Sequence, residues 1–298
     1  MTFKAAEYQR YSGPRSGIPA WVPLAELALS RGWKSKWVRR ITSLSLMQGV
    51  VMMIMMYALN QVVPSWRELT QQVGAIAGGD SDDFVIDAGM YLVLLKWFVY
   101  PVLLPLSLLF GYDLISKDIE TNALDAYFSR PISPLSYILG RSVAFVGFLM
   151  TATFGPMILV WVSDWATSDG AHFQQIAIVP FAMFWALLLI TVTLSLLVQA
   201  ITTITKSGLW TNISFVFIFI VMPLLALIIF SITGNLYVQK LSIFHNIFAV
   251  CEYALNEIPT NNQSPSTPAN VSISVMLTTS LVSFLIVYRG LKRRTFLG

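Results

Sequence analysis

Few side chains in this chain of 298 residues could bind a metal or act as a nucleophile or base. Its one cysteine, Cys251, excludes an internal disulfide and a cysteine-based zinc site. Its two histidines, His172 and His245, are far apart, and no phosphate-binding loop, dinucleotide-binding glycine motif or H-E-x-x-H motif occurs. We therefore expect no catalytic residue, no bound cofactor and no metal, and we expect that the chain is not an enzyme.

Thioether side chains are concentrated in one apolar stretch, at Met47, Met52, Met53, Met55 and Met56. Thioethers are soft ligands that suit Cu(I), so copper handling is one interpretation of this stretch. These methionines spread around a helix, however, and methionine is an ordinary flexible filler of apolar packing. We favour packing over metal binding.

The composition indicates an integral membrane protein. Soluble domains average about a quarter charged residues, whereas this chain is 11% charged and 56% hydrophobic. The first twenty residues contain no apolar segment of the kind found in a cleavable signal peptide. Apolar runs of about 20 residues match the thickness of a bilayer core. We expect one all-α membrane domain, 1–298, with six transmembrane helices at 41–63, 89–111, 137–162, 177–204, 209–232 and 271–289.

The positions of lysine and arginine predict the orientation, because the cytoplasmic loops of membrane proteins are rich in both. With the N-terminus in the cytoplasm, all of the 19 Lys and Arg residues lie on the inner side except Arg67, Lys240 and Lys96. The opposite orientation would place the inner group on the wrong face. We expect both termini to be cytoplasmic.

Two segments outside the spans have patterns of their own. In the predicted cytoplasmic tail 1–40, Leu24, Leu27 and Ala28 share one helical face among cations, which indicates an N-terminal interfacial helix. The outer loop 233–270 begins with a stretch too apolar for a free loop and too polar for a span. We expect a re-entrant or surface-lying helix pair there.

Two residues are candidates for a transport pathway. Lys96 is the one charge away from the inner end of a predicted span. It either extends outward to the interface or faces a polar cavity and meets an anionic substrate group. Gln199 belongs to a polar set in the fourth span, for which packing between helices is the alternative. No acid lies deep within a predicted span, which weakens an ion-coupled carrier as the interpretation.

The polar segment 112–136, between the second and third spans, reads as a structured element. As a helix over 115–129, it places polar residues on one face, apolar residues on the opposite face, and two large apolar residues on its flank. The polar set is Asp118, Asn122, Asp125 and Ser129, and the flank pair is Leu124 and Phe128. Arg130 precedes Pro131 and is biased away from helix. Ser133 and Pro134 then form a helix start.

Residues 113–144 read D-L-I-S-K-D-I-E-T-N-A-L-D-A-Y-F-S-R-P-I-S-P-L-S-Y-I-L-G-R-S-V-A. They resemble the segment between the second and third spans of ABC type-2 permeases. In that family an acidic stretch, a leucine, S-R-P-[IL]-S and Y-x-x-G-[KR] recur at this place. The six spans, the N-terminal interfacial helix and the long outer loop extend the resemblance over nearly the whole chain.

The resemblance implies the permease subunit of an ATP-driven exporter in the bacterial cytoplasmic membrane. Its partners would be two copies of a cytosolic ATPase subunit, which binds ATP and Mg²⁺, a second permease copy, most simply an identical one, and membrane lipids, but no nucleic acid. Segment 112–136 would be the coupling segment. The residues implied to dock on the ATPase are Asp118, Glu120, Leu124, Asp125 and Phe128.

Further residues would direct the chain back into the third span, namely Arg130, Pro131, Tyr137, Gly140 and Arg141. Gly140 would allow another helix to approach, and Arg141 would meet an acid of the docking segment or a lipid phosphate. The alternative from another class is a polytopic scaffold or membrane-assembly protein without transport activity. A secondary carrier is a weaker alternative.

Overall fold

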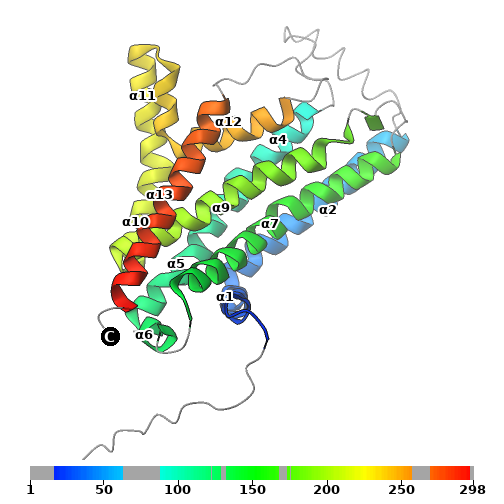
Figure 1. Ribbon diagram of the computed structural model, residues 1–298. Helices are drawn as coiled ribbons and strands as arrows, with labels where there is room; N and C mark the ends of the chain where they lie inside the picture. Colours follow the sequence, from blue (N-terminus) through cyan, green and yellow to red (C-terminus); the bar gives the residue numbers. More distant parts are fainter. Residues whose placement is uncertain are drawn as a thin grey trace, which may run out of the picture.

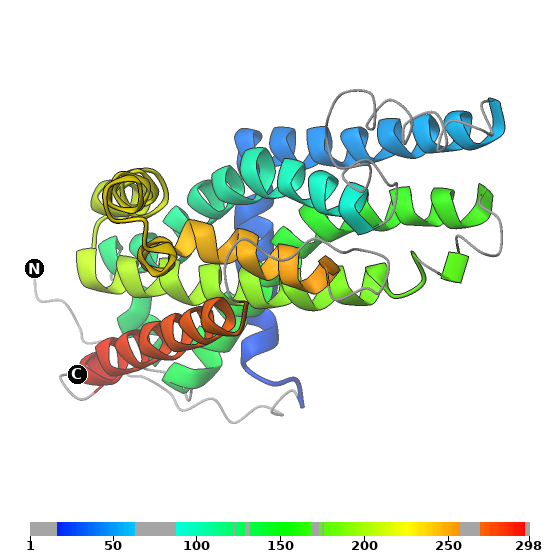
Figure 2. The same cartoon turned by 90° about the horizontal axis from the view of Figure 1, so that it is seen from above.

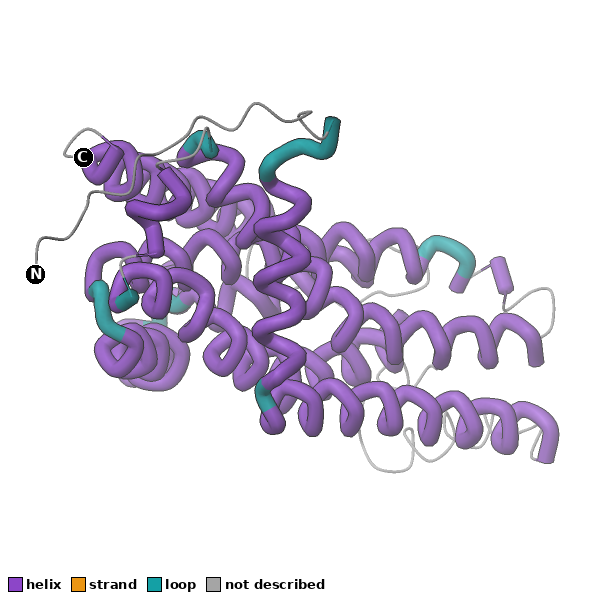
Figure 3. Tube along the Cα trace, turned by 90° about the horizontal axis from the view of Figure 1, so that it is seen from below, coloured by secondary structure: helices purple, strands orange, loops and turns teal. Residues whose placement is uncertain are grey.

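The computed structural model describes residues 17–62, 88–121, 123–128, 132–167, 173–174, 176–256 and 269–295. These residues form helices joined by short connections, and no strand occurs among them (Figure 3). The main helices are α1 (Trp21–Lys34), α2 (Lys36–Val62), α4 (Ala88–Phe98), α5 (Leu104–Glu120), α6 (Ala123–Phe128), α7 (Pro134–Thr167), α9 (Val179–Thr205), α10 (Gly208–Val216), α11 (Met222–Thr233), α12 (Ile243–Asn256) and α13 (Ala269–Thr295).

Six helical segments are long and apolar enough to cross a membrane, as the sequence predicts: Lys36–Val62, Met90–Glu120, Pro134–Thr167, Val179–Thr205, Gly208–Thr233 and Asn270–Arg293. The third segment is longer than the predicted 137–162. Its 34 residues span about 50 Å at 1.5 Å per residue. A hydrocarbon core is about 30 Å thick, so this helix is long enough to extend beyond the apolar layer.

Two spans are interrupted by π-helical turns next to prolines. The second span winds through η2 (Val99–Leu103), which contains Pro101, before α5 begins. The fifth span winds through η3 (Phe217–Val221), just before Pro223 in α11. Proline lacks a backbone N–H and cannot continue the normal hydrogen-bond ladder, so a wider turn at these places has a local cause.

The helix α2 packs along α7 (Figures 1 and 2). A Cβ atom on Gly49 of α2 would lie 2.5 Å from Cβ of Pro156 in α7, so only a glycine fits at this crossing. Farther along, the Ser163 hydroxyl donates to the carbonyl oxygen of Met53 at 3.0 Å. Small residues that permit close approach and hydroxyls that bond across helices are typical of packing in membranes.

The helix α9 is the centre of the bundle. More than half of its apolar window, 56%, is buried inside the chain, against 17% for the span formed by α10, η3 and α11. The latter span stands to one side of the other helices (Figure 1).

The two ends of the bundle carry different elements (Figure 1). The helices α1 and α6 and the C-terminal end of α13 lie at one end, while α12 and the beginning of α4 lie near the other. At the first end, Ser35 adopts an extended conformation (φ −69°, ψ 125°) that separates α1 from α2. As a result α1 lies across the bundle (Figure 2). The first spanning helix accordingly begins at Lys36 rather than at residue 41.

The predicted outer loop 233–270 contains two helical pieces, η4 (Leu236–Leu241) and α12. Apolar residues of α12 pack against α4, α9 and α13, which explains why this stretch is too apolar for a free loop. Residues 257–268 lie outside the described residues.

Candidate functional site

The polar segment between the second and third spans is not one helix over 115–129, as the sequence pattern predicts. The helix α5 continues to Glu120 and ends at Thr121, whose φ of −92° and ψ of 4° leave the helical region. Both the backbone N–H and the hydroxyl of Thr121 bond to the carbonyl oxygen of Lys117, at 2.9 and 2.6 Å. The short helix α6 then begins at Ala123. The backbone turn at Thr121, and not these hydrogen bonds, therefore divides the segment into two helices.

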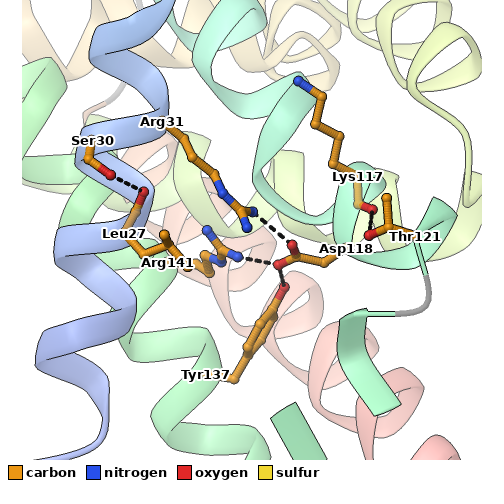
Figure 4. A network of polar contacts seen from close by, with 8 residues as sticks. All are labelled: Leu27, Ser30, Arg31, Lys117, Asp118, Thr121, Tyr137 and Arg141. Carbon is orange, nitrogen blue, oxygen red and sulfur yellow. Dashed lines mark hydrogen bonds and ion pairs between the residues drawn. The ribbon is translucent and has the colours of Figure 1, made fainter. Parts of the chain in front are cut away.

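A buried polar network lies in the last turn of α5 (Figure 4). Its centre is the carboxylate of Asp118, which is 1% exposed. One carboxylate oxygen accepts from Arg31 of α1 at 2.9 Å. The other accepts from the Tyr137 hydroxyl at 2.8 Å and from the guanidinium of Arg141, both on α7. One acid therefore joins three helices.

The beginning of α7 positions two members of this network. The predicted helix start is confirmed, because the Ser133 hydroxyl accepts from the backbone N–H of Ser136 at 3.1 Å and Pro134 is the first residue of α7. Tyr137 and Arg141 follow at a spacing of four, on one helical face. The Arg141 guanidinium lies 5.4 Å from the centroid of the Tyr137 ring, at cation–π distance.

The crossing of α1 over α7 brings Arg31 to the network. A Cβ atom on Gly140 would lie 2.7 Å from the carbonyl oxygen of Trp21 and 2.8 Å from Cβ of Leu24. Only a glycine lets α1 come so close. The helix that approaches at Gly140 is therefore α1.

The electrostatics of the network are asymmetric. Arg31 and Arg141 together carry two positive charges, and Asp118 carries one negative charge. Burial by itself would lower the pKa of Arg31, but the hydrogen bond to Asp118 and its charge raise that pKa above its ordinary value. The Nε atom of Arg141 is buried and has no hydrogen-bond partner among the described residues. Of the two partners predicted for Arg141, an acid of segment 112–136 and a lipid phosphate, the structure shows the acid, Asp118.

Two residues predicted to dock on an ATPase are buried in the chain itself. Asp118 is occupied by the network, and Leu124 of α6 is 0% exposed. Leu124 lines a cavity with Ile119 of α5 and Gly290 of α13. The helical pattern alone assigned both residues to an outer surface, but the break at Thr121 and the arginines of α1 and α7 place them inside.

The remaining residues of the coupling segment differ in what the structure describes. Glu120 is exposed and accepts from the backbone N–H of Gly208, the first residue of α10, at 3.3 Å. Asp125 and Phe128 belong to α6, but their side chains lie outside what the structure describes. Arg130 and Pro131 lie outside the described residues.

The two candidate pathway residues have polar partners outside the Asp118 network. The Lys96 ammonium is 3.0 Å from the carboxylate of Glu252, and the pair joins α4 to α12. Gln199 of α9 is fully buried, and its amide nitrogen donates to the hydroxyls of Ser142 at 2.8 Å and Ser195 at 3.1 Å. Its amide oxygen has no partner among the described residues. A pathway role for either residue stays a prediction.

Sequence reasoning missed three residues that the structure brings into polar networks. Arg31 belongs to a run of cations with no distinguishing signal, and Glu252 and Asp164 stand outside every motif in the sequence. Asp164 is 0% exposed near the end of α7 and accepts from the Tyr91 hydroxyl at 2.9 Å. Each partner comes from another helix, so no local pattern could reveal the pairs.

The methionines of the first span do not share one face of α2. Met47 is 58% exposed and Met56 is 2% exposed. Among the described residues, no group of three or more His, Cys, Asp or Glu side chains could hold a metal ion.

The six apolar helices and their packing define the class of a multi-pass, all-helical membrane protein. No protein-family model matches the chain, and no curated protein matches it. The particular function must therefore be argued from the residues and their arrangement.

Proposed function

We propose that this chain is the permease subunit of an ATP-driven exporter, powered by a separate cytosolic ATPase subunit. The observation that carries the proposal is the arrangement around α6. This short helix stands between the second and third spans, in the segment that resembles the coupling segment of ABC type-2 permeases. It directly follows a turn of α5 that the carboxylate of Asp118 joins to α1 and α7.

A rigid connection at this place is what force transmission needs. A helix on a free loop would move without moving the bundle. Here α6 is only two residues from α5, it contacts α5 and α13, and its Leu124 is buried. The Tyr127 ring of α6 also lies 6.0 Å from the Tyr137 ring of α7. A displacement of α6 is therefore passed to several spans together. In a dimer of permeases, two such displacements would alternately open the pathway to the two sides.

The burial of individual side chains limits which residues of the coupling segment can contact the ATPase. We assign the direct ATPase contact to Glu120, Asp125 and Phe128. Asp118 and Leu124 are excluded as direct contacts, because their side chains are buried. They act instead by fixing α6 to the bundle. ATP and Mg²⁺ bind to the ATPase, in two copies, and this chain binds neither.

We further propose that the protein lies in the bacterial cytoplasmic membrane as a homodimer, with α1 in the inner interface and both termini in the cytoplasm. The bundle end that carries α1 and α6 is then the cytoplasmic one, which agrees with the distribution of lysine and arginine. The exported substrate is not specified by any feature of the site.

The test is association with an ABC ATPase subunit encoded near this chain. The tagged full chain is co-expressed with the ATPase, and bound ATPase and its ATP turnover are measured after purification. We expect Asp125→Lys and Phe128→Ala to reduce bound ATPase by at least about tenfold, the loss that about 1.4 kcal/mol of lost contact produces. Glu26→Lys and Leu29→Ala are matched controls, because both residues are exposed on α1 at the same end of the bundle.

Two outcomes would contradict the proposal. If the α6 variants bind the ATPase as the controls do, α6 is not the docking element. If no ATPase co-purifies, or if its turnover is unchanged by the bound chain, a scaffold or membrane-assembly role explains the protein better. ATP-independent transport in vesicles would favour a carrier.

A further inference from the structure

The inner end of α9 and α13 carries a cavity with a charged mouth. It has a volume of about 600 Å³ and is lined by Lys206, Arg289 and Arg293 together with apolar residues that include Ile119 and Leu124. Lys206 follows the last turn of α9, where its φ of 54° caps the helix, and the two arginines lie in the last turns of α13. All three cations line the same cavity as Leu124 of α6, so they lie at the bundle end that carries α6.

A second cavity continues along the same two helices. It has a volume of about 510 Å³, and its lining comes from α9 and α13 alone, with Val275, Thr278 and Val282 among the residues of α13. Ile204 and Ile286 line both cavities, so the two form one groove. We call this surface the α9–α13 groove.

The groove has the length of a lipid tail. Its α13 side runs from Val271 to Ile286, which corresponds to about 22 Å at 1.5 Å per residue. One leaflet of a bilayer is about 15 Å thick, half of the roughly 30 Å hydrocarbon core. An acyl chain that follows the groove from the charged end can therefore lie against protein through its whole leaflet.

The charges at the mouth have no partner within the described chain. No ion pair or hydrogen bond joins the side chains of Lys206, Arg289 or Arg293 to an acid among the described residues. The nearby acid Glu120 faces the backbone N–H of Gly208 instead. Three unpaired cations beside an apolar groove are complementary to one phosphate joined to acyl chains.

We propose that the α9–α13 groove binds an anionic glycerophospholipid of the cytoplasmic leaflet. Its phosphate lies at Lys206, Arg289 and Arg293, and one acyl chain lies along the α9–α13 groove. Because Leu124 of α6 lines the same cavity as the three cations, the bound lipid also supports the coupling segment. The inference rests on the proposed orientation in the bilayer but not on the ATPase, so it stands or fails independently of the proposed ATPase partner.

The experiment is native mass spectrometry of the purified full chain, with equal amounts of phosphatidylglycerol and phosphatidylcholine. The test variant is Lys206→Gln/Arg289→Gln/Arg293→Gln. Its matched control is Lys34→Gln/Lys36→Gln/Arg39→Gln, which removes the same charge from exposed positions on α1 and α2. We expect wild type and control to retain phosphatidylglycerol, and the test variant to lose at least about tenfold of it, because each cation near a membrane surface contributes appreciably.

A second pair of variants tests the acyl chain. Val282→Trp fills the groove and leaves the cations intact, whereas Val143→Trp adds the same bulk at an exposed position of α7. We expect only Val282→Trp to weaken lipid retention. Circular dichroism and the thermal unfolding midpoint without added lipid establish that each variant is folded.

The proposal is overturned if the two triple variants retain phosphatidylglycerol equally, since the effect would then be one of total charge. It is also overturned if phosphatidylcholine is retained as well as phosphatidylglycerol in the wild type. If Val282→Trp has no effect, the mouth binds phosphate without an acyl chain in the groove. If Val282→Trp loses the dimer together with the lipid or in place of it, a second copy of the chain covers the groove. That outcome also overturns the proposal.

Discussion

Asp118 and Arg141 are 23 positions apart in the chain, yet they pair inside the bundle with only 1% of either side chain exposed. The pair joins the last turn of α5, which ends the second span, to the beginning of α7, which forms the third span. The end of α5 and the beginning of α7 are therefore held together at one defined point, and α6 follows α5 directly after that point.

Removing the charge of Asp118 should destabilise the protein. In Asp118→Asn, the buried guanidinium of Arg141 loses its counter-ion, and breaking one side of a buried pair costs about 3–5 kcal/mol. Thermal unfolding of the detergent-solubilised protein measures the loss. Glu120→Gln is the control, because Glu120 is exposed and glutamine can still accept from Gly208. Equal midpoints for the two variants would show that the network contributes no net stability.

Adding a methyl group at Gly140, where α1 and α7 are in close contact, should displace α1. Gly140→Ala places a methyl group against the backbone of Trp21, and overpacking of this kind costs about 1–3 kcal/mol. Gly147→Ala is the matched control on the same helix, since nothing lies within 4 Å of its added Cβ. We expect the control to be neutral or stabilising by up to about 1 kcal/mol. Spin-label distances between α1 and α7 report the displacement, and unchanged distances in Gly140→Ala would contradict the crossing.

Because the one native cysteine is buried, added cysteines can test the topology. Burial, and then the negative charge of Glu252, raises the pKa of the Cys251 thiol to about 12. The thiolate is the reactive form, so Cys251 should not react with maleimide at pH 8 until the protein is unfolded. Ser30→Cys and Tyr237→Cys then report separately on the two ends of the bundle, because both positions are exposed.

With an impermeant maleimide on intact cells, we expect labelling of Tyr237→Cys and none of Ser30→Cys before the membrane is opened. The reverse pattern would contradict the proposed orientation. Labelling of folded wild-type protein would contradict the burial of Cys251.

The free energy of unfolding should fall in acid because of His245, in α12. Burial, and then the positive charge of Lys240, lowers the pKa of His245 below 6.5. The unfolded chain therefore binds this proton more readily than the folded one, so the free energy of unfolding falls as the pH drops through 6.5 toward the lower folded-state pKa. Unfolding midpoints between pH 8 and 5 measure the fall. His245→Gln should flatten the profile, whereas identical profiles would show that His245 does not contribute.

Much of the fold is visible in the local sequence. Apolar length predicts six spans, and all six occur as helices of sufficient length. The restart of the chain at Ser133 and Pro134 is also local, since a cap and a proline act within one turn. The prediction of one continuous helix over 115–129 is wrong, because the backbone leaves the helical region at Thr121 and a second helix, α6, begins at Ala123.

The sequence alone determined the number of spans, the small stock of reactive groups and the place where the polar segment interrupts the bundle, because these depend on composition and on periodicity within single helices. Only the tertiary structure decided that Asp118 faces inward to Arg31 and Arg141, that Leu124 is covered, and that Gly140 admits α1. A carboxylate on a helix has the same local pattern whether water or a guanidinium faces it. The difference depends on which distant helix crosses at that point.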